Sequence, residues 1–207
     1  MLEFVATHKY ERVLFHQLEP MRNMKPKANE TRKRQQGIEV AKAEGYTHFF
    51  LADADELYFS EEVEKAKLLF NDPSVNGLVC PLRVYVGKPT LWCEEDTLIS
   101  FIHKLNRKTS TGDNPRYPFA YDKKGIAHID GTRRINETNG IRKCDVVCQH
   151  YSYVRSNINM KIKNSTANLS KREDLIKRDI ERSKPGYFSE IYHQPLKESE
   201  NYFNIIV

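Results

Sequence analysis

The sequence predicts an α/β fold in which helices flank a mixed sheet. Helical and strand-like patterns alternate over the first half of the chain, and further strand-like runs follow. The 207 residues suffice for one mid-sized domain with its own core. With 39% hydrophobic and 29% charged residues, the chain is not collagen, low-complexity disorder or a disulfide-dense miniprotein. We expect a single domain over residues 1–207, in which residues 157–207 form a helical C-terminal extension.

Local patterns place the first elements. Asn29 is suited to cap a helix that ends at Gly45. The apolar run 46–52 has the length of a strand. Ser60 is expected to cap a second helix. The apolar residues of that helix share one face: Val63, Ala66 and Phe70.

Further strands are expected in the second half of the chain. Three runs have strand character: residues 78–86, 98–105 and 145–154. Pro81 falls within the first of them, so we expect it at an edge or a bulge. The stretch 108–118 is rich in Gly, Asp, Asn and Pro and is expected to be a loop.

Charge and cysteine content bound the class of partner and the location. A net charge of +5 suits an anionic ligand such as a phosphate, and no motif of a nucleic-acid-binding module accompanies it. No apolar run reaches the roughly 20 residues of a membrane span, and no signal peptide is visible. The four cysteines lack metal-site spacing, which favours free thiols in a reducing compartment. We therefore expect a cytoplasmic chain, or one peripheral to a membrane, with no nucleic-acid partner.

The most informative stretch is Asp53-Ala54-Asp55-Glu56, which places three acids directly after an apolar run. Neighbouring carboxylates repel one another, and a cation relieves that repulsion. Asp53 and Asp55 share one face of an extended chain. Carboxylates suit Mg²⁺ and Mn²⁺, which keep open positions for phosphate oxygens. The alternative is a purely structural role for these acids in a turn or at the start of a helix, where Asp and Glu are also common.

Residues 31–56 resemble the core of a GT-A glycosyltransferase of the family 2 type. In that family an Arg and a Gly lie early in a helix, here Arg34 and Gly37, and a Gly ends it, here Gly45. An apolar strand then delivers the DxD motif, often followed by a Glu. The resemblance implies a GT-A-like sheet, an Mn²⁺ or Mg²⁺ cofactor, a nucleotide-sugar donor such as a UDP- or GDP-sugar, and a glycan or other hydroxyl acceptor. It also implies inversion at the anomeric carbon.

A second match starts at His150, in His150-Tyr-Ser-Tyr-Val-Arg155 followed by Met160 and Lys161. This segment is similar to a His-aromatic-Val-Arg segment in some family members. The resemblance implies that Asp55 and His150 bind the ion and that Asp53 lies near the ribose or the ion. It also implies that Arg34 and Arg155 contribute to the donor site, where the planar fork of Arg155 suits a diphosphate. A structural His150 and an ordinary ion pair at Arg155 are the alternatives.

An inverting transferase needs a carboxylate that accepts the proton of the acceptor hydroxyl. Glu95 and Asp96 are the preferred candidates, because they follow Trp92 and an acid beside an aromatic ring suits a sugar site. Asp113 and Asp130 remain open as alternatives. Trp92 itself either stacks on a sugar or belongs to the core.

The sequence departs from the family at its start. Only 28 residues precede Asn29, too few for the nucleotide-binding strand-helix-strand unit of about 30 residues or more. We therefore expect a truncated nucleotide-binding half. This leaves an alternative function, a non-catalytic or partner-dependent module with the GT-A fold. A haloacid-dehalogenase-like phosphatase fits less well, because Leu57 stands where that family has Thr or Val. No GxGxxG motif supports a Rossmann oxidoreductase.

Overall fold

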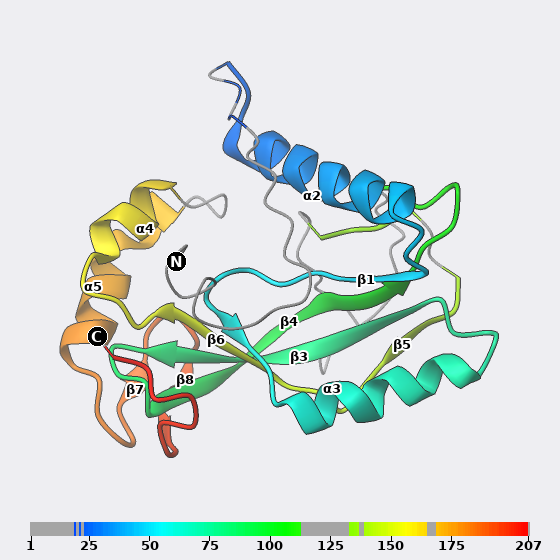
Figure 1. The fold of residues 1–207 in the computed structure, drawn as a ribbon. Coiled ribbons are helices and arrows are strands. Elements are labelled where there is room, and N and C mark those ends of the chain that lie inside the picture. Colours follow the sequence, from blue (N-terminus) through cyan, green and yellow to red (C-terminus); the bar gives the residue numbers. More distant parts are fainter. Residues whose placement is uncertain are drawn as a thin grey trace.

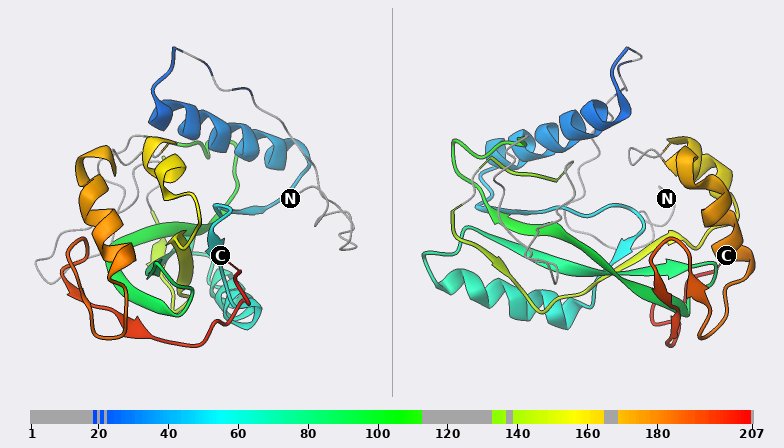
Figure 2. Two further views of the ribbon diagram at one scale, coloured as in Figure 1. Left: turned by 90° about the vertical axis from the view of Figure 1, so that its left-hand side faces the viewer. Right: turned by 180° about the vertical axis from the view of Figure 1, so that it is seen from behind.

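A curled mixed sheet with helices around it forms the centre of the molecule, as Figures 1 and 2 show. The computed structural model describes residues 19, 21, 23–112, 133–136, 139–164 and 169–206. The expected general class, α/β with a mixed sheet and flanking helices, is confirmed.

The sheet is built on a long hairpin. Strands β3 (Gly77–Val86) and β4 (Leu91–Lys104) pair antiparallel, and β5 (Ile141–Lys143) and β6 (Cys148–Tyr153) both run parallel to β3. The strand order is β1-β4-β3-β6-β2. The remaining strands are short: β1 (His48–Phe50), β2 (Glu56–Leu57), β7 (Phe188–Ser189), β8 (Gln194–Pro195) and β9 (Lys197–Glu198).

The hairpin contains the irregularity that Pro81 predicts. The register between β3 and β4 shifts between Pro81 and Leu82, so the proline occupies a bulge where its missing N–H is tolerated. Strand β4 is longer than the expected 98–105, because it begins at Leu91. The acids that follow Trp92 therefore lie in a strand.

Helix α2 (Pro26–Ala43) and helix α3 (Ser60–Lys67) both flank the sheet, and they lie apart from each other (Figure 1). Helix α2 begins with a proline, which fits a first-turn position, and its cap is Lys25. Asn29 lies inside the helix, so the expectation that it caps the helix was wrong. Gly45 follows the end of α2 with φ of +76°.

Helix α3 continues into the 3₁₀ turn η1 (Leu68–Asn71). Its cap is Phe59, so the expectation that Ser60 caps it was wrong by one residue. The apolar face of α3 is confirmed, since Ala66 is buried with Val63 and Phe70 packed around it.

Helices and short strands share the C-terminal segment. Helix α4 (Ile158–Asn164), the turn η2 (Leu169–Arg172) and helix α5 (Glu173–Glu181) come first, and strands β7, β8 and β9 follow. Asp179 is fully buried in α5 and accepts hydrogen bonds from the hydroxyls of Tyr187 and Ser189 and from two backbone N–H groups. The carboxylate of Asp179 thus connects α5 to the chain that follows it within this segment. Strand β9 pairs with β4 and connects the segment to the sheet.

The core lies between the sheet and the elements around it. One cluster joins α3 to the sheet, a second joins α2 to it through Ile38, and a third joins α4 and α5 to the far end of the hairpin. Each of the four cysteines is a buried free thiol: Cys80, Cys93, Cys144 and Cys148. Among the described residues, the helices are too short or too polar to cross a membrane.

Candidate functional site

The acidic residues lie in a short connection between the two ends of the strand order. Residues 51–55, here named the acidic strap, connect β1 to β2 (Figure 1). The N–H of Leu51 donates to the Phe101 carbonyl on β4 at 3.0 Å, and the Tyr151 N–H on β6 donates to the Asp55 carbonyl at 2.8 Å. The strap is short although β1 and β2 lie at opposite ends of the strand order, because the sheet curls and brings these two ends close together. The curl therefore also brings β6, the partner of β2, to the strap.

A turn sets the directions of the strap's side chains. The N–H of Glu56 donates to the Asp53 carbonyl at 3.1 Å, and the N–H of Asp53 donates to Oε2 of Glu56 at the same distance. Asp is favoured at the first position of such a turn. The chain then enters β2, where Glu56 lies opposite His150 of β6. The motif is therefore fixed at both ends by the backbone.

Asp53 is held by two arginines. Nη2 of Arg34, from α2, lies 3.0 Å from Oδ1 and 3.2 Å from Oδ2 of Asp53, and Nη2 of Arg133 lies 2.6 Å from Oδ2. Burial by itself raises the pKa of Asp53, but the two guanidinium charges outweigh it and hold that pKa below its usual value. Asp53 is therefore an ionised anchor between α2 and the segment that contains Arg133.

Arg133 also forms a buried ion pair with Glu56. The two side chains are only 1% and 2% exposed, respectively. The Tyr58 hydroxyl donates to Oε2 of Glu56 at 3.2 Å, so the carboxylate is bound on several sides. A buried charge is tolerated when it is paired and hydrogen-bonded, and this network meets both conditions. It fixes the turn on which Asp53 and Asp55 stand.

Asp55 faces a different set of groups, from the end of β6 and from α4. Nη2 of Arg155 lies 2.7 Å from Oδ2 of Asp55, and Nζ of Lys161 lies 3.2 Å from the same oxygen. Nε2 of His150 lies 3.6 Å from Oδ1, just beyond hydrogen-bond range. Burial raises the pKa of Asp55, but His150 and Lys161 outweigh it, so the pKa lies well below its usual value.

The facing atoms of Asp55 and His150 suit a divalent ion. A carboxylate oxygen and an imidazole nitrogen are both ligands of Mn²⁺, and 3.6 Å is a separation that two ligands bound to one ion at about 2.1 Å can have. Arg155 and Lys161 repel a free cation, so Asp55 and His150 are best suited to an ion that an anionic ligand accompanies. Within the described ranges, no group of three or more His, Cys, Asp or Glu residues is arranged to hold a metal.

Five of the seven predicted site residues converge. Arg34 reaches Asp53, and His150 and Arg155 reach Asp55 across about a hundred positions of sequence. Both oxygens of Asp53 are engaged by arginines in this structure. The expected pairing of both aspartates around one ion therefore differs from the observed arrangement, in which each has its own cations.

Glu95 and Asp96 lie elsewhere, in β4. Glu95 is paired with Leu82 of β3, whose other neighbour is Cys148 of β6, so it lies two strand spacings, about 10 Å, from β6. Asp96 falls at the register shift of the same strand. Trp92 is buried in a hydrophobic cluster with Tyr85 and Tyr151, and the charged ends of Arg83 and Lys197 lie 4.3 and 4.8 Å from its ring centroid, which matches its core interpretation. The alternative bases Asp113 and Asp130 lie outside the described residues.

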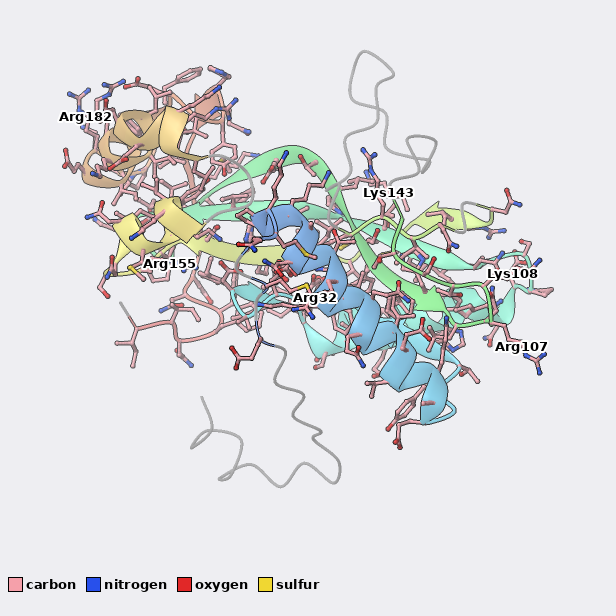
Figure 3. All side chains as sticks on the ribbon, turned by 90° about the horizontal axis from the view of Figure 1, so that it is seen from above. Arg32, Arg107, Lys108, Lys143, Arg155 and Arg182 are labelled. Atoms are coloured by element: carbon pink, nitrogen blue, oxygen red, sulfur yellow. The ribbon has the colours of Figure 1, made fainter. Side chains whose placement is uncertain are left out.

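Sequence reasoning gave no role to two residues of this site. Arg133 stands in an unremarkable Arg-Arg pair, and only the fold brings it to Glu56 and Asp53. Lys161 was part of the second motif, and its spacing of six residues from Arg155 contains the signal: α4 begins between them and turns Lys161 back toward Asp55. Figure 3 shows Arg155 beside α4, at the opposite end of the molecule from Arg107 and Lys108.

Comparisons with known proteins add no assignment. A search against protein-family models finds no match for this chain, and a search of curated proteins finds none either. The geometry of the acidic strap and its cations, together with the resemblance of the two motifs, is what bears on function.

Proposed function

We propose that this chain is a metal-dependent glycosyltransferase with a GT-A-like fold that moves a sugar from a nucleotide-sugar donor to a hydroxyl acceptor. One observation carries the proposal. Asp55 of the DxD motif faces His150 at 3.6 Å and binds Arg155 and Lys161 through its other oxygen. Two motifs that are far apart in sequence, and that resemble one family, thus meet around a single carboxylate.

The charges of the site suit a diphosphate leaving group. Departure of the nucleotide places negative charge on phosphate oxygens, and preorganised cations stabilise it. Arg155 and Lys161 are partly exposed, at 34% and 24%, so both side chains lie at the surface of the site. A divalent ion held by Asp55 and His150 would add a further positive charge at the phosphates. The chain's own contribution is to orient these groups on the strap.

Asp53 has a supporting role in this proposal. Its two arginines fasten the strap to α2 and to the buried Glu56 network, which keeps Asp55 in place. Catalytic groups act best when their own positions are fixed in advance. The two carboxylates expected to accept the proton of the acceptor hydroxyl, Glu95 and Asp96, stand in β4 and not on the strap or on β6.

Ligand-induced stabilisation tests this proposal. We expect Mn²⁺ together with UDP or GDP to raise the melting temperature of the wild-type chain, because a ligand that binds only the folded state stabilises it. Asp55→Asn keeps the size of the side chain, and it should abolish the shift. Glu64→Gln, at an exposed α3 residue paired with Lys67, is the matched control and should retain it. A wild-type chain that shows no shift with either nucleotide would contradict the proposal.

Turnover distinguishes a transferase from a binding module. We expect slow hydrolysis of a UDP- or GDP-sugar by the wild-type chain in the presence of Mn²⁺, with Asp55→Asn inactive. Release of free sugar, followed by chromatography, is the measurement. Nucleotide binding with no hydrolysis of any donor would favour the non-catalytic module of the same fold.

A further inference from the structure

We propose that Arg155 and Lys161 make divalent-ion binding at Asp55 conditional on a diphosphate. Without a ligand, these two cations occupy the carboxylate; a diphosphate draws them away and frees Asp55 for the ion. This inference rests on the proposed function and adds a specificity role for Lys161, to which neither motif assigns one.

The two oxygens of Asp55 have unlike surroundings. Oδ2 contacts both cations, at 2.7 Å from Arg155 and 3.2 Å from Lys161, whereas the contact of Oδ1 among the described residues is with the imidazole of His150, at 3.6 Å. A cation that approaches this carboxylate therefore meets two positive charges at close range. Their repulsion opposes metal binding as long as they stay on Oδ2.

The groups also differ in how firmly the fold holds them. His150 stands in β6, in backbone register with Glu56, so its position belongs to the sheet. Arg155 and Lys161 follow the end of that strand, on the loop before α4 and on α4 itself. Both are long, partly exposed side chains that change rotamer far more easily than a strand moves. The cations are thus the mobile partners of Asp55, and His150 is the fixed one.

A diphosphate is the ligand class that satisfies both cations at once. Asp55 offers Arg155 and Lys161 one shared oxygen, while a diphosphate offers several oxygens on two phosphorus atoms. Nε of Arg155 is buried and has no hydrogen-bond partner among the described residues, so the contact with Asp55 leaves this guanidinium incompletely hydrogen-bonded. A monophosphate offers fewer oxygens and less charge, and it should displace the cations less completely.

The consequence is a thermodynamic coupling between ion and diphosphate. Each should raise the affinity of the other by the same factor, because binding couplings are reciprocal. For the wild-type chain we expect this factor to be about 10 or larger with UDP, and smaller with UMP. The coupling arises on the protein, so it is read after subtraction of the Mn²⁺–nucleotide complex that forms without protein.

Titration of Mn²⁺ with and without UDP, followed by the electron paramagnetic resonance signal of the free ion, tests the inference. In Lys161→Met, which removes one competing charge, Mn²⁺ alone should bind about 5-fold more tightly than to the wild type, and the coupling with UDP should fall by a similar factor. Lys163→Met is the matched control, because Lys163 is exposed on the same helix and its removal changes the net charge equally. It should leave both quantities unchanged. Arg155→Met should behave like Lys161→Met.

The possible failures are distinct. If Lys161→Met weakens UDP binding but leaves the affinity for Mn²⁺ alone unchanged, Lys161 only binds phosphate and the inference is overturned. Equal coupling with UMP and UDP overturns the selection of a diphosphate. If neither Mn²⁺ nor UDP binds the wild-type chain, the proposed function itself fails and the inference fails with it.

Discussion

At the scale of single residues, the site is a set of carboxylates whose neighbours decide their roles. Asp53 and Asp55 have the same chemistry and stand two positions apart, yet one is fastened by two buried arginines and the other faces accessible cations and an imidazole. The sequence predicted which residues meet here because the two motifs carry them. It could not predict that Asp53 and Asp55 contact different cations, because the contacts of Asp53 include Arg133, which belongs to neither motif.

The buried pair of Arg133 and Glu56 gives a residue-scale prediction. Arg133→Met should lower the free energy of unfolding by about 3–5 kcal/mol, because it leaves the carboxylate of Glu56 buried without its cation. Urea unfolding measures the change. Arg142→Met removes an exposed arginine paired with Asp72 and is the control, with an expected loss of about 0–1 kcal/mol.

A double-mutant cycle completes this test. In Glu56→Gln/Arg133→Met both charges are gone, so the loss should be smaller than the sum of the two single losses. Equal losses from Arg133→Met and Arg142→Met would show that the buried pair does not hold the strap.

At the scale of elements, the sequence predicted those with strong local patterns. The helix that ends before Gly45, the apolar face of α3 and the bulge at Pro81 were all readable from the chain. The first half of β4 was not, because Glu94, Glu95 and Asp96 are poor strand formers. Pairing with β3 overrides that local preference. Two-residue strands such as β2 leave no periodic signal at all.

The end of β4 contains a titratable group that makes the sheet sensitive to acid. Burial lowers the pKa of His103 to about 3, and its ring stacks on Phe49 with centroids 5.5 Å apart. The folded chain therefore keeps this imidazole neutral at pH values where the unfolded chain protonates it. Stability from this group is complete above about pH 6.5 and is lost as the pH falls toward 3.

The slope of stability against pH measures this effect. Between pH 6 and pH 4 the wild type should lose up to about 1.4 kcal/mol per pH unit more than His103→Gln, whatever the offset between the two proteins. Urea midpoints at three pH values suffice. Parallel slopes for the two proteins would contradict a neutral buried His103.

At the scale of the whole molecule, the site exists because the sheet curls. The acidic strap reaches from β1 at one end of the strand order to β2 at the other, and this crossing brings Asp55 to β6 and α4. Local patterns predict strands but not their order, so the sequence alone gave the partners of Asp55 only through resemblance. The same limit explains Glu95 and Asp96, whose position in β4 follows from the sheet rather than from the neighbouring tryptophan.

Asp55 and His150, brought together by this crossing, are the residues that we propose to hold one divalent ion beside a diphosphate. Electron–nuclear double resonance of Mn²⁺ bound to the chain with UDP tests this claim directly. We expect couplings to both ¹⁴N and ³¹P in the wild type, and loss of the ¹⁴N coupling alone in His150→Gln. A wild-type spectrum with ³¹P but no ¹⁴N coupling, or a ¹⁴N coupling that survives in His150→Gln, would contradict the claim.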